Sequence, residues 1–470
     1  MTDRDKTGRD ETGPESAKDT VRPVPVEGPS FAFAEEGEGF DKLSPNGAGA
    51  VATNFSKSPT DWDSSEMAKR IRRRYAAERR FRWVGLGAIL LSAGFLALLL
   101  FTMVSNGARG FTRTEVRLDV DFASAALFLD PATLRSTGAK AALAGSDLQG
   151  VVAKAAEAQY GALGARLFSD TAWLKVLDSI EADPSLLTRS GSLWLPASTE
   201  IDVAAKGDGD PAAERAYSEL GSRDSARTRF NGDFLTSADA TDPAAVGIWG
   251  AFKGSLLTML VTIAIAFPVG VLSAVYLEEY APRNRWTDLI EVSINNLAAV
   301  PSIIFGLLGL AVFLNVMHMP RSAPLVGGLT LALMTMPVIV IAGRNAIKSV
   351  PPSIRDAALG VGASRIQVVY HHVLPLALPG ILTGTIIGMA RALGETAPLL
   401  MIGMRAFIST PPGGVADPAT VLPVQIFLWS DEVSRGFVEK TSAAIIVLLV
   451  FLMAMNGVAI YLRNKFERRW

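Results

Sequence analysis

Apolar residues along this 470-residue chain gather in six long runs, separated by stretches that are rich in polar residues. The runs occupy residues 83–104, 251–276, 291–315, 325–347, 376–403 and 440–462. Each run is as long as the roughly 20 residues that a helix needs to cross the hydrocarbon core of a bilayer. The pattern therefore predicts an α-helical integral membrane protein with six transmembrane helices.

The chain begins with a polar stretch, residues 1–65, that is rich in Gly, Pro, Ser, Thr, Asp and Glu and has no apolar periodicity. This composition predicts a disordered tail. The stretch has no early apolar segment, so we do not expect a signal peptide. A basic segment follows, KRIRRRYAAERRFR at residues 69–82, and leads directly into the first run. Residues 66–104 are thus predicted to form a basic anchor and the first span.

A second long polar stretch, residues 105–247, lies between the first two runs. Apolar residues alternate over residues 112–122, which indicates a strand with one buried face. The Ala-rich residues 148–168 favour a helix, and the short apolar segment 192–196 favours a second strand. We expect a small inserted α/β domain here, and it carries no motif that indicates chemistry. The residues predicted on the buried face of the strand are Val116, Leu118, Val120 and Phe122.

Proline and glycine have specific places in the later runs. Proline is tolerated inside a transmembrane helix because neighbouring helices can satisfy the carbonyl groups that it frees. Small residues spaced by four indicate close packing of one helix against another. The prolines within the runs are Pro268, Pro301 and Pro337, and the glycines spaced by four are Gly380, Gly384 and Gly388.

Basic residues indicate the orientation in the membrane. They gather before the first run, at Arg283 and Arg285, within residues 344–365, and after the last run. With six spans, all four places fall on one side, and loops rich in Lys and Arg are typically cytoplasmic. We therefore expect a multi-pass protein of the bacterial inner membrane with both termini in the cytoplasm. The insert is then periplasmic, and so are residues 404–439, whose PPGG and LPV stretches indicate irregular structure.

Composition excludes several classes of protein. Hydrophobic residues make up 49% of the chain and charged residues 19%, and the formal net charge is −1, so no global positive charge points to nucleic acid as a partner. The chain has no cysteine and three histidines, which leaves no disulfide, no thiolate nucleophile and no convincing metal site. It has no G-x-x-x-x-G-K-[ST] loop, so ATP hydrolysis is not expected on this chain. We predict no catalytic residues and no metal.

A loop at about residues 348–375 resembles the EAA loop of ABC importer permeases, which docks on the ATPase subunit. Small alanines would let a short helix sit deep in a groove of the ATPase, and the glycine would permit a tight turn between two helices. Asp356 stands where the family usually has Glu, and His372 where it commonly has an aliphatic residue. The residues that match the loop are Asp356, Ala357, Ala358, Gly362, Leu374 and Pro375.

Longer segments are similar to phosphate-importer permeases of the PstA type. These are NLAAVPSIIFGLLGLAVF at 296–313, RNAIKSVP at 344–351 and ARALGETAPLL at 390–400. Residues 70–250 resemble the extended N-terminal form of that family. The resemblance implies a type I ABC importer permease fold in residues 248–470. It also implies three partners besides membrane lipid: a PstC-type permease, a homodimeric PstB-type ATPase that holds ATP and Mg, and a periplasmic phosphate-binding protein.

Two charged residues, Arg391 and Glu395, interrupt the fifth run. An arginine near the middle of a span costs roughly 2.5–3.5 kcal/mol on insertion scales, so something must compensate for it. The two residues are one helical turn apart and can pair. Either they neutralise each other within the bundle, or both line a path for an anion. We adopt the second interpretation. Arg344, at the cytoplasmic end of the fourth run, is a candidate exit residue, and a positive-inside anchor is the alternative.

The sequence thus favours the permease subunit of an ATP-driven phosphate importer over three alternatives. A permease for sulfate or molybdate would keep the docking loop but should lack the GETAPLL stretch. A secondary transporter should show internal repeats, and no clear repeat is present. A membrane-anchored sensor would use the insert as its ligand site, and the intramembrane charges argue against helices that serve only as anchors.

Overall fold

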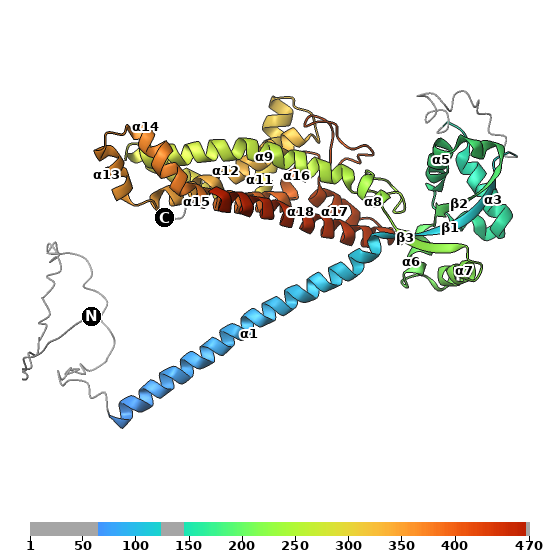
Figure 1. The fold of residues 1–470 in the computed structure, drawn as a ribbon, viewed down its shortest axis with the longest axis horizontal. Helices are drawn as coiled ribbons and strands as arrows, with labels where there is room; N and C mark the ends of the chain where they lie inside the picture. The colour runs from blue at the N-terminus through green and yellow to red at the C-terminus, as the bar shows by residue number, and fades with distance from the viewer. Residues whose placement is uncertain (1–63, 124–144, 467–470) are drawn as a thin grey trace, which may run out of the picture. The chain divides into compact units, whose positions relative to one another are not determined.

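The computed structural model describes residues 64–123 and 145–466 (Figure 1), and its contacts divide the chain into two units after Trp83. The predicted tail, residues 1–65, lies outside the described residues apart from its last two. From Ser65 the chain is a single helix, α1 (Ser65–Gly110), which contains both the basic segment and the first apolar run. Its buried residues, Gly107 and Gly110, lie near its C-terminal end and pack against α18 (Gly436–Phe466).

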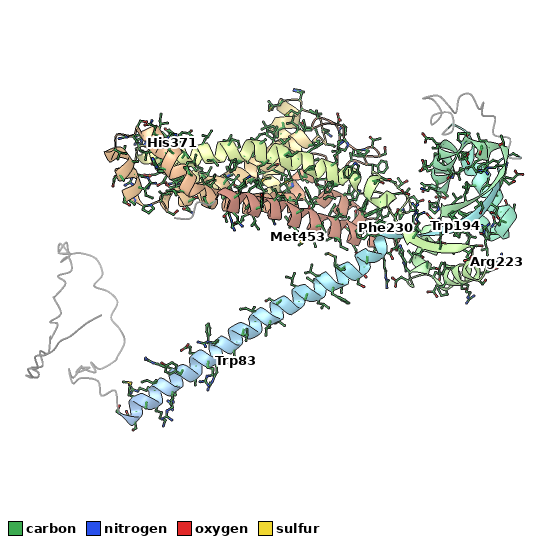
Figure 2. All side chains as sticks on the ribbon, viewed as in Figure 1. Trp83, Trp194, Arg223, Phe230, His371 and Met453 are labelled. Atoms are coloured by element: carbon green, nitrogen blue, oxygen red, sulfur yellow. The ribbon has the colours of Figure 1, made fainter. Side chains whose placement is uncertain are left out.

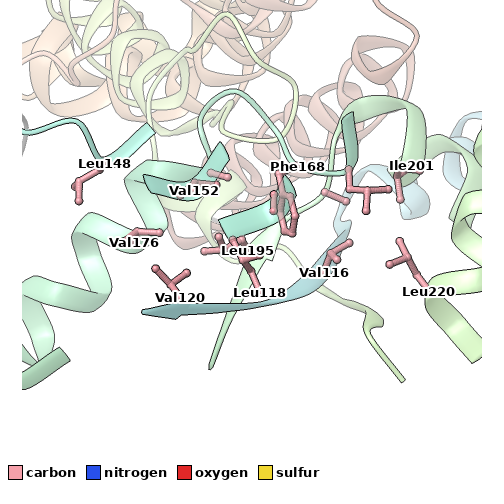
Figure 3. Close-up of a cluster of buried hydrophobic side chains, with 14 of the residues drawn as sticks. Val116, Leu118, Val120, Leu148, Val152, Phe168, Val176, Leu195, Ile201 and Leu220 are labelled. Carbon is pink, nitrogen blue, oxygen red and sulfur yellow. The ribbon is translucent and has the colours of Figure 1, made fainter. Parts of the chain in front are cut away.

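The insert is built on a three-stranded antiparallel sheet with the order β2-β1-β3. The strands are β1 (Thr112–Asp121), β2 (Ser190–Pro196) and β3 (Ala226–Phe230). The alternating pattern predicted this central strand, and the four side chains assigned to its inner face are all buried. Figure 3 shows Val116, Leu118 and Val120 of this set near apolar side chains from neighbouring elements, among them Leu148, Val176 and Leu195. The prediction of both strands is confirmed.

Helices pack against the buried face of this sheet. The predicted helix over 148–168 is wrong in its length: α3 ends at Tyr160 because Gly161 has a φ of +68°, in the left-handed region. A 3₁₀ turn (Gly161–Leu163) and α4 (Gly164–Leu167) follow. The other elements of the insert are α5 (Ala172–Ala182), a 3₁₀ turn (Pro184–Thr188), α6 (Thr199–Ala205), α7 (Pro211–Ser222) and α8 (Asp233–Thr236).

Buried charges fasten the insert to the ends of two long helices. Lys206, at the end of α6, contacts the carboxylates of Asp202 and Glu439 at 2.7 Å each. Glu439 belongs to the first turn of α18, and the neighbouring Lys440 donates a hydrogen bond to the carbonyl oxygen of Gly110 at 2.8 Å. Because each buried charge has a polar partner, the junction of α1, α6 and α18 is held by specific contacts.

Among the described residues, five helices are long and apolar enough to cross a membrane. They are Ser65–Gly110, Trp249–Tyr280, Pro324–Lys348, Arg365–Gly394 and Gly436–Lys465. Within them lie α9 (Trp249–Val275) with a terminal π-helical turn η4 (Tyr276–Tyr280), α12 (Pro324–Lys348), and α15 (Leu374–Gly394). The segments α9, α12, α15 and α18 run alongside one another (Figure 1).

The third predicted span, 291–315, is not one continuous helix. The chain forms α10 (Arg285–Ala298) and α11 (Ser302–Gly309), the latter continued by a π-helical segment (Leu310–Val316), with a bend of 101° between them. Pro301 causes the break, because proline cannot donate a backbone hydrogen bond and disfavours helical geometry in the residue before it. The pair gives a sixth span only if both halves cross as one broken segment.

Small residues allow α12 and α15 to approach closely, as their four-residue spacing predicted. A Cβ atom on Gly380 would lie 2.7 Å from the Cβ of Ala346, and one on Gly388 would lie 2.9 Å from Thr335 Cγ2. A Cβ on Gly384, between them, would collide with Ala342. The predicted packing stripe is therefore confirmed, and it runs antiparallel along α12.

The fifth predicted span, 376–403, differs at both ends. One continuous helix runs from Arg365 through a π-helical segment (Val368–Val373) into α15, so the Leu374–Pro375 pair does not end a helix. At the other end α15 stops at Gly394, and a short helix α16 (Ala397–Met401) follows. The predicted irregular LPV stretch is also wrong, since it begins α17 (Leu422–Ser430) with Pro423 in the first turn, where proline is favoured.

Candidate translocation and coupling site

Arg391 and Glu395 lie at the end of the fifth helix rather than in its middle. Arg391 is in the last turn of α15, and Glu395 is the first residue after that helix. Arg391 Nε lies 3.4 Å from Glu395 Oε1, so the predicted pair forms. The Arg391 side chain is 51% exposed and that of Glu395 is 19% exposed. The prediction of an arginine in the middle of the span is wrong, because Glu395 has extended backbone geometry and the helix ends before it.

The pair leaves hydrogen-bond donors available. Among the described residues, the Nε atom of Arg391 has a hydrogen-bond partner, and neither of its two Nη atoms has one. A Cβ atom on the adjacent Gly394 would meet no atom within 4 Å. A guanidinium with a free fork of donors suits the oxygen atoms of a phosphate-like anion. The neighbouring carboxylate can accept a hydrogen bond from a protonated form of such an anion.

Arg344 is in a different environment. Its side chain is 13% exposed, and its guanidinium contacts Glu291 of α10 at 2.9 Å and Glu278 of η4 at 3.4 Å. Lys348, one turn further along α12, lies 3.7 Å from the same Glu278 carboxylate. Arg344 therefore joins three helical segments, and its Nε and Nη2 atoms donate to carboxylates.

The structure does not bring Arg344 and Arg391 together. On the antiparallel helices α12 and α15, Gly343 packs beside Ile381, ten residues before Arg391. At 1.5 Å per residue, the two arginines are about 15 Å apart along the bundle. If both contact one anion, they do so at successive positions on a path.

The predicted coupling loop is a helix, a tight turn and a second helix. α13 (Pro352–Gly360) is followed by Gly362, whose φ of +89° is in the left-handed region that favours glycine. The second helix begins with α14 (Arg365–Gln367), where Ser364 and Gln367 form a reciprocal capping box. His371 lies beside α13 and α14 at this end of the helical bundle (Figure 2). The turn predicted at Gly362 is confirmed.

Not all the residues predicted for docking are accessible. Asp356 and Ala357 are exposed, whereas Ala358 is 6% exposed and packs on the chain's own core with Val368 and Val373. Leu374 and Pro375 are half-buried at the base of α15. Ala358 thus allows α13 to pack closely on its own bundle.

Four apolar residues around this turn were not predicted as part of the site. They are exposed, and such side chains in a polar loop are typical of a protein interface. A signal was present in the sequence, because apolar residues flank the glycine on both sides without a matching buried face. The four residues are Leu359, Val361, Ile366 and Tyr370.

Two sequence families match this chain. The family described as "Binding-protein-dependent transport system inner membrane component" matches residues 266–470. A family described as "Domain of unknown function (DUF3333)" matches residues 68–215, which include most of α1 and part of the insert.

Individual proteins match about half of the chain. A "Probable ABC transporter permease protein YqgI" from Bacillus subtilis is 32% identical over 250 residues, which cover 48% of this chain and 83% of that protein. "Phosphate transport system permease protein PstA 1" from Mycobacterium tuberculosis strain H37Rv is 31% identical and covers 48% and 72%. "Phosphate transport system permease protein PstA" from Yersinia pestis is also 31% identical and covers 48% and 75%.

Among solved structures, a chain of the inward-facing MetNI methionine ABC transporter matches 47% of this chain and 98% of its own length. The sequence identity is 17% and the TM-score is 0.39.

Proposed function

Because this chain belongs to the family of binding-protein-dependent transport system inner membrane components and is a PstA-type permease with an N-terminal extension, we propose that it carries inorganic phosphate across the inner membrane in an ATP-driven importer. It is a multi-pass ABC importer permease of the type I fold. The similarity to phosphate transport permeases from several bacteria is the observation that carries the choice of substrate.

The geometry of Arg391 supports an anion as the substrate. Its exposed guanidinium has free donors beside an open glycine, and Glu395 lies next to it. Phosphate at neutral pH is a mixture of singly and doubly charged forms, so it can both accept hydrogen bonds from an arginine and donate one to a carboxylate. Sulfate is fully ionised and can only accept, so Glu395 would repel it.

The proposed transport function needs partner subunits. ATP and Mg would be held by a homodimeric PstB-type ATPase, and the exposed turn around Gly362 would dock on it. Val361 is 86% exposed, and its apolar neighbours on the loop give a partner a surface to bury. A PstC-type permease would complete the path, and a periplasmic phosphate-binding protein would deliver the anion.

The test is transport by the assembled complex in proteoliposomes. The chain is purified with the second permease and the ATPase, the binding protein is added outside the vesicles, and ATP is enclosed. We expect ATP-dependent accumulation of labelled phosphate and no accumulation of labelled sulfate or molybdate. A complex that accumulates sulfate or molybdate in place of phosphate would contradict the proposed substrate. ATP-independent accumulation would contradict the proposed energy source.

A further inference from the structure

Arg355, the residue before the Asp356–Ala357–Ala358 sequence, joins α13 to the ends of two other helices. Its Nε and Nη2 atoms donate to Glu279 Oε1 at 3.1 and 2.8 Å. Its Nη1 atom donates to the carbonyl oxygen of Val350 at 2.7 Å, and Nη2 also donates to that of Ile347 at 3.0 Å. One guanidinium thus binds a carboxylate and two backbone carbonyls.

These acceptors belong to the cytoplasmic ends of α9 and α12 as we have oriented the chain. Glu279 lies in η4, the π-helical turn that ends α9. Ile347 lies in the last turn of α12 and Val350 just after it. Carbonyl groups at the end of a helix lack hydrogen-bond donors within that helix. Arg355 supplies donors to these groups, and the planar fork of its guanidinium fixes the direction of each bond.

The neighbouring carboxylate in η4, that of Glu278, is bound by basic residues of α12. Glu278 contacts Arg344 at 3.4 Å and Lys348 at 3.7 Å, and both of these basic residues belong to α12. The two adjacent carboxylates of η4 therefore receive basic residues from α13 and from α12. This arrangement ties the ends of α9, α12 and α13 together through one short π-helical turn.

Apolar packing supports the same junction. Ala358 and Ile354 of α13 lie in one apolar cluster with Ile347 and Val350 from the end of α12. This cluster also contains Ile381 of α15, the helix that carries Arg391. A continuous path of apolar contacts thus leads from α13 to the helix of the proposed anion site.

We propose that the Arg355–Glu279 pair positions the coupling helix and transfers its displacement to α9 and α12. Apolar contacts alone can slide, whereas a fork of hydrogen bonds with fixed directions resists both sliding and rotation. ATPase movement at the exposed face of α13 then shifts the ends of α9 and α12 with it. This inference rests on the proposed function, because it assigns a role in coupling ATP hydrolysis to transport.

The first test uses Glu279→Gln in the reconstituted complex. The substitution keeps the size of the side chain but removes the negative charge that strengthens the bonds from Arg355, and Arg355 keeps its two carbonyl bonds, so α13 stays in place. We expect the ATPase to co-purify as in the wild type. Phosphate taken up per ATP hydrolysed should fall roughly fivefold or more, which is the lower end of typical coupling effects. The matched control is Arg283→Gln, on a loop at the same end of the bundle, where the arginine has no ion pair in the described structure.

A double-substitution cycle tests whether the two residues act as one unit. Arg355→Gln alone should lower the uptake per ATP at least as much as Glu279→Gln. The double variant should show no loss beyond that of Arg355→Gln, because the shared contact has already gone. Losses that multiply in the double variant would overturn the proposal, since they would mean that the residues act independently.

Two other results would overturn it. A Glu279→Gln complex with wild-type uptake per ATP would show that the pair does not transmit displacement. Failure of this variant to bind the ATPase would show that the pair only builds the docking surface. If the wild-type complex imports another anion, the substrate proposal fails, but the ratio of anion transported to ATP hydrolysed still tests Arg355 and Glu279.

Discussion

At the scale of single residues, the same side-chain type has different roles because its surroundings differ. Arg391 is half-exposed and has one partner at 3.4 Å, whereas Arg344 is mostly buried between two carboxylates. Arg355 is bound to a carboxylate and two carbonyls. Of these three arginines, Arg391 is the most exposed, and neither of its Nη atoms has a partner among the described residues. The contacts therefore favour Arg391 for the substrate path, and Arg344 and Arg355 for holding helices together.

We predict that an Arg391→Met, Glu395→Gln double variant assembles with its partners but imports phosphate poorly. Arg391 is exposed enough that its loss strands no buried charge in this chain. A hydrogen bond to a charged group contributes about 1.5–3 kcal/mol, so uptake should fall by roughly tenfold or more. Complex yield and initial uptake rate are measured together, with Arg283→Met as the control. Near-normal uptake would mean that the two charges have a structural role.

At the scale of the elements, proline and glycine decide where helices end or turn. Pro301 splits the third apolar run into two helices that meet at 101°. Pro423, by contrast, lies in the first turn of α17, where its missing donor costs nothing. Gly161 ends α3, and Gly362 makes the turn after α13. The same residue type breaks or begins a helix according to its position in that helix.

The packing of α12 on α15 predicts a strong effect of bulk at Gly384. A Cβ at this position would collide with Ala342, so Gly384→Val should force the two helices apart. Overpacking of this kind typically costs about 1–3 kcal/mol. We expect a lower unfolding temperature or a lower yield of the detergent-purified chain. Gly457→Val in α18 is the matched control, because a Cβ there meets no atom within 4 Å, and equal losses in both variants would contradict the packing argument.

The turn after α13 predicts a difference between two nearby glycines. Gly362 has a φ of +89° and Gly360 does not have a positive φ, while a Cβ on either meets no atom within 4 Å. An L-residue in the left-handed region costs roughly 1–2 kcal/mol, so Gly362→Ala should disturb the turn and Gly360→Ala should not. Co-purification of the ATPase should therefore be weaker with Gly362→Ala. An equal loss with both variants would implicate added bulk at the docking surface and would contradict the role of backbone geometry.

At the scale of the whole chain, an insert of helices and a three-stranded antiparallel sheet is joined to the bundle of long apolar helices. Lys206 contacts Glu439 of α18, Lys440 contacts the end of α1, and Arg109 of α1 contacts Asp208 beside α6 at 2.6 Å. These contacts involve segments that are more than 200 residues apart in the chain, apart from the last pair. The insert is therefore held on the bundle by several directed contacts and not merely by its two chain connections.

The proposed orientation predicts which loops are accessible from outside the cell. The natural chain has no cysteine, so single cysteines can be labelled without background. We expect Gly221→Cys, in the insert, to react with a membrane-impermeant maleimide in intact cells. Arg283→Cys should react only after permeabilisation. Both sites are exposed, so reaction of both from the same side would reject the orientation with cytoplasmic termini.

The sequence by itself determined the apolar helices, the buried face of β1, the glycine stripe of α15 and the turn at Gly362. Each of these depends on a short-range pattern: the length of an apolar run, alternation along a strand, or the freedom of glycine. The sequence also indicated Arg391 and Glu395 as candidate site residues, since two charges in an apolar run are unusual wherever the run lies.

Only the tertiary structure decided the 101° bend, the early end of α15, and the contacts of Ala358, Arg344 and Arg355. Ala358 has the same side chain as Ala357, and whether it faces a partner or its own bundle depends on how α13 packs on the π-helical segment Val368–Val373. The contacts of Arg344 and Arg355 involve acidic residues some 50 to 80 positions away in the chain. Local sequence patterns cannot report such contacts, because they arise only when the helices pack together.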